Sequence, residues 1–303
     1  MSTHEQTAAG SGAPLVPATV AVVGGGTMGA GIVQQFLTAG ADVVLVEATA
    51  QAAEAGRARV ASGLDGARAR GKIDAEPAAY LARLRTVTDA ADIPAGTGLV
   101  VEAVPERPEL KIAVLAAAEA AVGEDTVLAS NTSSLSVTEL AAALKRPRRF
   151  LGTHFFNPVP ASKLVEIVVA PETDPGVLAS VRGWVAALGK TEIVVRDAPG
   201  FATSRLGVML GLEAIRMVEE GVASPADIDT AMELGYRHPM GPLRLTDLVG
   251  LDVRLAIAEH LASELGDRFT PPDLLRRMVA EGKLGKKTGQ GFHTWDKGEQ
   301  SVE

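Results

Sequence analysis

The stretch 19–48, TVAVVGGGTMGAGIVQQFLTAGADVVLVEA, decides the fold of this chain. An apolar strand runs into three consecutive glycines, which open a helix of small residues that leads to a second apolar strand. Gly24, Gly26 and Gly29 form the pattern G-x-G-x-x-G directly after the first strand. In this context the first glycine permits a tight turn, the second lets a pyrophosphate approach the backbone, and the third lets the helix pack on the strand. The amino end of the helix then offers N–H groups to the phosphates.

An acidic residue, Glu47, follows the second strand, eighteen residues after Gly29. A carboxylate at this position accepts hydrogen bonds from the adenosine ribose hydroxyls and repels a 2′-phosphate. Residues 48–50 offer no arginine that would favour such a phosphate. The sequence therefore predicts a site for NAD, in which Thr27 and Met28 join the glycines around the phosphates. The alternative is an ordinary glycine turn beside a solvated glutamate.

Composition and charge exclude several classes of protein. The 303 residues include 37 acidic and 29 basic side chains, a net charge of −8 with no long basic run, which argues against nucleic acid as a partner. The absence of cysteine removes disulfides, thiolate catalysis and cysteine-based zinc sites, and no metal site is predicted. No apolar run reaches the ~18 residues of a membrane span. Residues 1–17 lack the basic and apolar regions of a signal peptide, so we expect a disordered tail and a cytoplasmic protein.

Short β-rich runs alternate with alanine-rich helical stretches through the first two thirds of the chain. The expected strands are 18–23, 42–46, 98–104, 126–129, 149–155, 163–169 and 191–195, with helical spacing between them, for example at 108–122 and 175–188. Such alternation implies parallel pairing with right-handed crossovers. After the segment 197–201, DAPGF, the strand signal stops. Helices are then expected at 201–220, 224–234, 244–265 and 271–281.

The predicted fold class is α/β, with a Rossmann-type doubly wound, mostly parallel sheet followed by an all-helical C-terminal domain. The expected domains are 18–199 and 200–303, with the boundary near Pro199-Gly200.

A reaction that passes a hydride from an alcohol to NAD needs a base to take the hydroxyl proton, and histidine suits this near neutral pH. Three of the five histidines lie in the tail, in a helix or near the C-terminus: His4, His260 and His293. Of the other two, His238 and His154, only His154 falls at the end of a strand, where ligands collect in an open α/β sheet.

Glu166 lies twelve residues beyond His154, in a strand that is apolar on both faces. A carboxylate there is expected to be buried and to need a partner. An imidazolium that the carboxylate stabilises, with its tautomer fixed, meets that need. The sequence thus predicts a His154–Glu166 pair, although a histidine near a strand end is more often structural.

Several longer motifs carry a resemblance. The chain resembles the short-chain L-3-hydroxyacyl-CoA dehydrogenases, especially the bacterial 3-hydroxybutyryl-CoA dehydrogenases, from about residue 18 to 295. The motifs that carry the resemblance are GGGTMGAGI, VVEAVPE, SNTSSLSV, THFFNPVPASKLVEIV, DAPGFATSRL, DIDTAMELGYRHPMGPLRLTDLVGLD and LGKKTGQGF.

The resemblance implies roles for individual residues. His154 would be the general base for oxidation and Glu166 its orienting partner. Ser133 would hydrogen-bond the substrate oxygen that is oxidised, although a serine in SNTSS is otherwise read as a turn or N-cap residue. Asn157 would lie by the nicotinamide carboxamide and ribose. Glu106 and Lys111 would lie near the nicotinamide ribose, although Lys111 taken alone is a solvated helix charge.

The resemblance also implies partners. In the family a helical hairpin after the second strand, here 56–73 within an insertion near 50–85, helps to bind CoA. Arg68, Arg70 and Lys72 would meet the CoA phosphates, unless they form only a solvated charged face. The C-terminal helical domain would form a homodimer interface and close over the substrate.

One position departs from the family pattern. The family usually reads P-G-F-x-x-N-R-L, in which the asparagine belongs to the active site, and this chain has Ser204 in its place. Serine keeps a donor and an acceptor but is shorter and lacks the second amide donor. Ser204 is therefore a candidate active-site residue that affects substrate preference.

The resemblance implies reversible oxidation of a short-chain (S)-3-hydroxyacyl-CoA thioester, such as 3-hydroxybutyryl-CoA, to the 3-oxoacyl-CoA with NAD. The alternatives are a relative that acts on an acyl-carrier-protein thioester or a free hydroxy acid, and a non-catalytic NAD-binding structural protein.

Overall fold

A computed structural model of the chain describes residues 16–295. The chain divides into two compact units, of which the described parts are 16–197 and 198–295. The predicted tail, 1–17, lies outside the described residues except at its end. There the prediction is wrong, because Val16 is buried in the core of the first unit.

The first unit contains an eight-stranded sheet with the strand order β3-β2-β1-β4-β5-β6-β7-β8. Its strands are β1 Thr19–Val23, β2 Asp42–Val46, β3 Leu84–Val87, β4 Leu99–Glu102, β5 Val127–Ser130, β6 Phe150–Phe155, β7 Leu164–Val169 and β8 Thr191–Arg196. All neighbours are parallel except β6 and β7, which are antiparallel. The predicted α/β class with a mostly parallel sheet is confirmed.

Strand β3 was not predicted, and it lies where the predicted insertion near 50–85 ends. Its sequence, LRTV, buries only Leu84, because β3 is the edge strand of the sheet and has no neighbour on its other side. An edge strand lacks the continuous apolar run that marks a strand covered on both faces.

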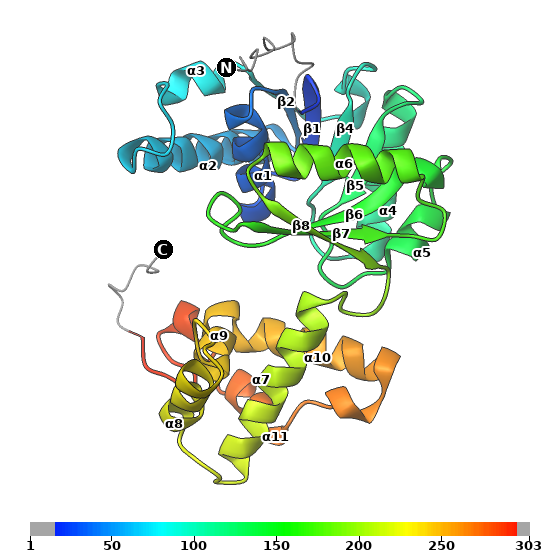
Figure 1. The fold of residues 1–303 in the computed structure, drawn as a ribbon. Coiled ribbons are helices and arrows are strands. Elements are labelled where there is room, and N and C mark those ends of the chain that lie inside the picture. The colour runs from blue at the N-terminus through cyan, green and yellow to red at the C-terminus, as the bar shows by residue number, and fades with distance from the viewer. Residues whose placement is uncertain (1–15, 296–303) are drawn as a thin grey trace, which may run out of the picture. The chain divides into compact units, whose positions relative to one another are not determined.

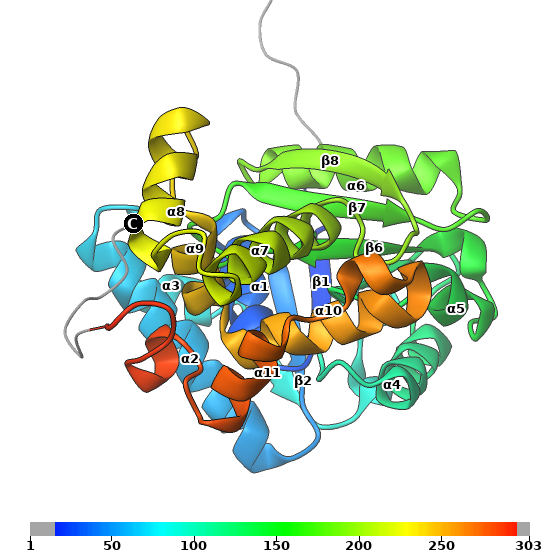
Figure 2. The same cartoon turned by 90° about the horizontal axis from the view of Figure 1, so that it is seen from below.

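Helices cover both faces of this sheet (Figure 1). They are α1 Thr27–Thr38, α2 Ala50–Ala69, α3 Pro77–Leu81, α4 Pro108–Ala121, α5 Val137–Ala142 and α6 Pro175–Ala187. Helices α1, α2 and α6 contribute to one apolar cluster with the sheet, while α4 packs on β4 and β5 and α5 on β6 and β7. Figure 2 shows α6 along β8, and α4 and α5 away from it.

The strand order reverses between β1 and β4. From β1 the chain continues outward through β2 and β3, and it then returns to β4 on the other side of β1 and continues through β5 and β6. The loops after β1 and β4 therefore diverge at the carboxyl edge of the sheet. Open α/β sheets bind ligands in the crevice at such a reversal.

The second unit is helical and has its own apolar core. Its α-helices are α7 Thr203–Glu219, α8 Pro225–Thr230, α9 Pro242–Val249, α10 Leu251–Leu265 and α11 Asp273–Ala280. The helix predicted at 244–265 is two helices, because Gly250 between them has a φ of 102°. The helix predicted at 224–234 ends in a π-helical turn, Ala231–Gly235. Across the described part of the chain, no helix combines the length and apolar character needed to cross a membrane.

Candidate active site

The glycine-rich loop joins β1 to α1 at the reversal of strand order. Gly24 has a φ of 98°, and a Cβ there would lie 2.8 Å from the carbonyl oxygen of Ala103. A Cβ at Gly29 would overlap the carbonyl oxygen of Gly24, so only glycine lets α1 pack this closely on the turn. A Cβ at Gly26, in contrast, would meet nothing within 4 Å. The first and third glycines are thus required by packing, and the second borders open space.

The amino end of α1 fits an anionic group in that space. Gly26 is the N-cap residue and no side chain caps the helix. Thr27 and Met28 form its first turn; Thr27 is exposed, and Met28 is half-buried against the core. An uncapped helix start with an open approach is suited to a phosphate. The residues therefore fit the pyrophosphate of NAD.

Glu47 lies beside this loop. Its Oε1 accepts a hydrogen bond of 2.5 Å from the N–H of Gly25, and its Oε2 accepts one of 3.3 Å from the N–H of Ala48. The carboxylate therefore ties the end of β2 to the glycine turn while the side chain stays half-exposed. This places a fixed negative charge next to the glycine-rich loop.

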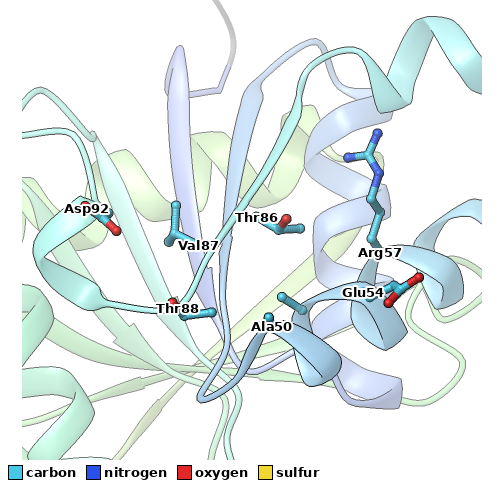
Figure 3. A pocket seen from close by; sticks show the side chains of 8 residues that line it. Ala50, Glu54, Arg57, Thr86, Val87, Thr88 and Asp92 are labelled. Carbon is cyan, nitrogen blue, oxygen red and sulfur yellow. The ribbon is translucent and has the colours of Figure 1, made fainter.

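A groove of about 520 Å³ opens beside the carboxyl end of β3 (Figure 3). Its lining side chains come from the start of α2, from the end of β3 and from the loop after it: Ala50, Ala53, Glu54, Arg57, Thr86, Val87, Thr88 and Asp92. None of the site residues predicted from the sequence lines this groove. It adjoins the segment after Glu47, because the N–H of Glu47 donates to the carbonyl oxygen of Val87.

His154 and Glu166 form a buried pair. They are directly opposite each other in the antiparallel β6–β7 ladder, so their side chains share one face of the sheet. The imidazole Nδ1 lies 2.7 Å from Glu166 Oε2, and the side chains are 10% and 0% exposed, respectively. The predicted proximity of the two residues agrees with this geometry.

The contact with Glu166 determines which nitrogen of the imidazole carries the proton. Because the carboxylate is an acceptor, Nδ1 carries a proton, and the neutral ring then has its lone pair on Nε2. The ring of Phe156 lies at 4.4 Å from the imidazole, between centroids, with a tilt of 47°. A base with a fixed tautomer beside a carboxylate can take a proton and stabilise the resulting imidazolium.

Glu106 organises the turn that contains Ser133. Its Oε1 accepts hydrogen bonds from Thr132 Oγ1 at 2.6 Å and from the N–H groups of Ser133 and Ser134 at 2.9 and 3.1 Å. Burial acts to raise the pKa of Glu106, but the Lys111 charge and these hydrogen bonds outweigh it, and the pKa lies below its usual value. The Ser133 hydroxyl itself lies 3.4 Å from the same oxygen.

Lys111 is not a solvated helix charge, and that interpretation of the sequence is wrong. Its side chain is 1% exposed, and its ammonium lies 2.7 Å from Glu102 Oε1 and 3.2 Å from Glu106 Oε2. Lys111 and Glu106 were both predicted to lie near the nicotinamide ribose, and in the structure they form a direct ion pair. Contact of either residue with the cofactor stays a prediction.

Two residues that were not predicted from the sequence also belong to this region. Asn131 Oδ1 accepts a hydrogen bond of 2.9 Å from the N–H of Phe155, which links the end of β5 to the strand that carries His154. Glu102 is 0% exposed at the end of β4. The pattern from which the burial of Glu166 was predicted, a carboxylate inside an apolar strand, also occurs at Glu102 in LVVEAV, where no burial was predicted.

Four further residues were predicted from the sequence: Asn157, Arg68, Lys72 and Ser204. Asn157 follows β6 and is exposed. Arg68 and Lys72 lie at the end of α2 and just after it; Arg68 pairs with Glu76 at 3.0 Å, while Lys72 is exposed. Ser204 is the second residue of α7, in the second unit, and is half-buried. The roles of these four residues stay predictions.

Comparison with known proteins identifies relatives over nearly the whole chain. Residues 19–198 match the NAD binding domain of 3-hydroxyacyl-CoA dehydrogenase, and residues 200–295 match the C-terminal domain of the same family. The 3-hydroxybutyryl-CoA dehydrogenase of Mycobacterium tuberculosis is 43% identical, over 91% of this chain and 98% of the relative. The mitochondrial hydroxyacyl-coenzyme A dehydrogenase of Sus scrofa is 41% identical, over 95% of each chain.

The fold has close counterparts among solved structures. The crystal structure of (S)-3-hydroxybutyryl-CoA dehydrogenase from Ralstonia eutropha superimposes with a TM-score of 0.87 at 43% identity, and the match covers 93% of this chain and all of that one. These matches confirm the resemblance drawn from the sequence motifs.

Proposed function

The chain belongs to the 3-hydroxyacyl-CoA dehydrogenase family and has its NAD-binding domain, and on that premise we propose that it oxidises short-chain (S)-3-hydroxyacyl-CoA thioesters reversibly, 3-hydroxybutyryl-CoA among them. The observation that carries the proposal is the buried His154–Glu166 pair at the end of β6. A retired enzyme with a purely structural role has no physical need for a buried histidine–carboxylate pair, because a buried charge is costly unless it is partnered.

His154 acts as the general base in the oxidation. Nε2 takes the proton of the 3-hydroxyl group while the carbon–hydrogen bond at the same carbon breaks, and Glu166 stabilises the imidazolium that forms. In the reverse direction the imidazolium returns the proton to the 3-oxo oxygen. Ser133 donates a hydrogen bond to that oxygen, and the Glu106 carboxylate holds the backbone of its turn.

The glycine-rich loop and Glu47 would hold the cofactor. The first turn of α1 would donate N–H groups to the pyrophosphate, and Glu47 would accept hydrogen bonds from the adenosine ribose hydroxyls. NAD, when bound, accepts the hydride from the substrate carbon. We propose that Asn157, Glu106 and Lys111 lie toward its nicotinamide end.

The partners of the chain are part of the same proposal. Arg68 and Lys72, near the end of α2, bind the CoA phosphates. The helical second unit forms a homodimer, and the protein is cytoplasmic. A carrier-protein thioester or a free hydroxy acid is the alternative substrate.

One assay tests this proposal. The loss of NADH absorbance is followed with acetoacetyl-CoA, with acetoacetate and with an acetoacetyl-carrier-protein thioester. We expect kcat/KM to be highest for the CoA ester. Turnover of the free acid or the carrier-protein thioester with equal or higher kcat/KM would reject CoA as the carrier, and no turnover of any of the three would reject the dehydrogenase.

The carboxylate of Glu47 should determine the choice of cofactor. The wild-type protein is expected to prefer NADH strongly over NADPH, because the carboxylate accepts ribose hydroxyls and repels a 2′-phosphate. Glu47→Ser should reduce the preference for NADH over NADPH, chiefly by weakening the binding of NADH. Serine is also too short to accept the hydrogen bond that Glu47 accepts from the N–H of Gly25. Measurement of kcat/KM for both cofactors checks this, and equal wild-type values would contradict it.

Ser204 should affect the range of acyl chains. If its hydroxyl bonds the substrate or a water beside it, Ser204→Ala leaves an acceptor unpaired at a cost of about 1–3 kcal/mol, so kcat/KM falls ~10-fold or more. Ser204→Asn should stay active but shift the preferred chain length. Kinetics on C4 to C10 3-oxoacyl-CoA substrates check both variants, and superimposable profiles for all three proteins would remove Ser204 from the active site.

A further inference from the structure

Within residues 16–197, the most deeply buried carboxylate outside the His154–Glu166 pair belongs to Glu102. Its Oε1 accepts hydrogen bonds of 2.7 Å from the N–H of Val104 and from Lys111 Nζ, and its Oε2 accepts one of 2.5 Å from Ser130 Oγ. The side chain is 0% exposed at the carboxyl end of β4. The proposed reaction does not use it, and a buried charge of this kind persists only when every partner is in place.

Lys111 connects Glu102 to Glu106, whose side chain is partly exposed. Its Nζ lies 2.7 Å from Glu102 Oε1, 3.2 Å from the carbonyl oxygen of Val104 and 3.2 Å from Glu106 Oε2. An ammonium group has three donors, and these three oxygens account for all of them. Glu102 thereby sets where the ammonium lies, and the ammonium sets where Glu106 lies.

Glu106 in turn holds the turn 132–134. While Oε2 contacts Lys111, Oε1 accepts the N–H groups of Ser133 and Ser134 and the hydroxyl of Thr132. Glu102 thus contacts Ser130, the last residue of β5, directly, and it is linked to the turn 132–134 through Lys111 and Glu106.

The same segment is joined to the strand of His154. The N–H of Asn131 donates to the backbone carbonyl oxygen of Glu102 at 2.8 Å, and Asn131 Oδ1 accepts from the N–H of Phe155 at 2.9 Å. Hydrogen bonds thus hold both ends of the segment Ser130–Ser134. Within it, Asn131 is fixed against Phe155, the residue next to His154.

We propose that Glu102 is a positioning residue, which acts through Lys111 and Glu106 to hold the turn that presents Ser133 to the substrate. The part of this inference that concerns substrate rests on the proposed function of Ser133. The competing explanation is that Glu102 and Lys111 are only a buried ion pair that stabilises the sheet.

Glu102→Gln tests the positioning role with little change in shape. Glutamine keeps an acceptor for Val104 or Ser130 but removes the charge that fixes Lys111, so the ammonium shifts toward Glu106 and the turn loosens. We expect the N–H groups of Ser133 and Ser134 to exchange with solvent deuterium about tenfold faster. Exchange is measured on the purified full chain by mass spectrometry of a peptide that spans 131–136.

Glu119→Gln is the matched control. Glu119 is also a buried carboxylate, lies on α4 like Lys111, and accepts the N–H groups of Lys145 and Arg146 at 2.9 and 2.7 Å. It has no contact with the chain of groups from Glu102 to Ser133. The control should leave exchange in 131–136 unchanged even if it lowers the melting temperature, and acceleration in both variants to the same extent would support the purely structural explanation.

A double-mutant cycle of Glu102→Gln with Ser133→Ala tests whether Glu102 affects catalysis through Ser133. If Glu102 acts through Ser133, each single variant lowers kcat about tenfold and the double variant is little worse than either, because the same interaction is lost. Additive losses near a hundredfold would show that Glu102 acts by another route and overturn the proposal.

The outcomes separate this inference from the proposed function. Unchanged exchange at Ser133 and Ser134 in Glu102→Gln overturns the positioning role. Faster exchange together with a fully active Ser133→Ala supports the positioning role and rejects instead the contact of Ser133 with substrate. If Glu102→Gln does not fold, Glu102→Gln combined with Lys111→Met removes both buried charges together with the ion pair that Lys111 makes with Glu106. Faster exchange at Ser133 and Ser134 in this variant supports the positioning role, and unchanged exchange overturns it.

Discussion

Replacement of His154 with glutamine is expected to lower kcat by roughly 10²–10⁴, which is the usual contribution of a general acid–base group. Glutamine is similar in reach to histidine and can still donate to Glu166, but it cannot take or return a proton. NADH binding should be nearly unchanged, because the glycine-rich loop and Glu47 follow β1 and β2 rather than β6. Steady-state kinetics with acetoacetyl-CoA and fluorescence titration of NADH check the two parts.

The pH dependence of Glu166→Gln distinguishes a working pair from two neighbouring residues. The base must be neutral to take a proton, and the carboxylate stabilises the charged imidazolium. Removal of its charge makes the imidazolium lose its proton more readily, so the acidic limb of the oxidation rate should move to lower pH. A limb that stays in place, or a His154→Gln variant with more than a tenth of wild-type kcat, would contradict the assignment.

The second large effect is expected from Gly29→Ala. The new Cβ would overlap the carbonyl oxygen of Gly24, which belongs to the backbone and cannot turn away as a side chain can. Helix α1 must therefore move off the turn, and overpacking of this severity costs about 3 kcal/mol or more. We expect a clear loss of melting temperature and of NADH affinity in the same variant.

Gly26→Ala is the matched comparison within the same loop. Gly26 has φ −63° and ψ −170°, which alanine adopts without strain, and its Cβ would meet nothing within 4 Å. Its stability should stay within about 1 kcal/mol of wild type. Its NADH affinity should nevertheless fall about tenfold, because the methyl group enters the space expected for the pyrophosphate. Equal stability losses in Gly26→Ala and Gly29→Ala, measured by thermal unfolding, would show that the two glycines do not differ as proposed.

Two buried carboxylates in apolar strands, Glu166 and Glu102, show how far the sequence could be interpreted. Glu166 was found because an acidic residue in an apolar strand needs a partner, and a histidine twelve residues earlier could supply it. Glu102 occupies an equivalent context, but its partner Lys111 lies on a helix whose spacing predicts a solvated charge. The position of a lysine on α4 does not show whether its side chain is buried until the strands that pack against the helix are known.

The sequence by itself determined what depends on near neighbours along the chain. Apolar runs and helical spacing determined seven of the eight strands, and the spacing of Gly24, Gly26 and Gly29 determined the cofactor loop. The motifs determined the family. These features are local because backbone conformation and side-chain periodicity are set within a few residues.

The tertiary structure decided how the predicted His154–Glu166 pair is brought together and which other distant groups meet. The antiparallel register of β6 and β7 places His154 opposite Glu166, although strand–helix alternation favours parallel pairing. Burial of Lys111 against Glu102, and the hold of Glu106 on the Ser133 turn, likewise depend on the packing of α4 against β4 and β5. The physical reason is that the free energy of a charge depends on its burial and on its partners, and both are set by residues far away in the sequence.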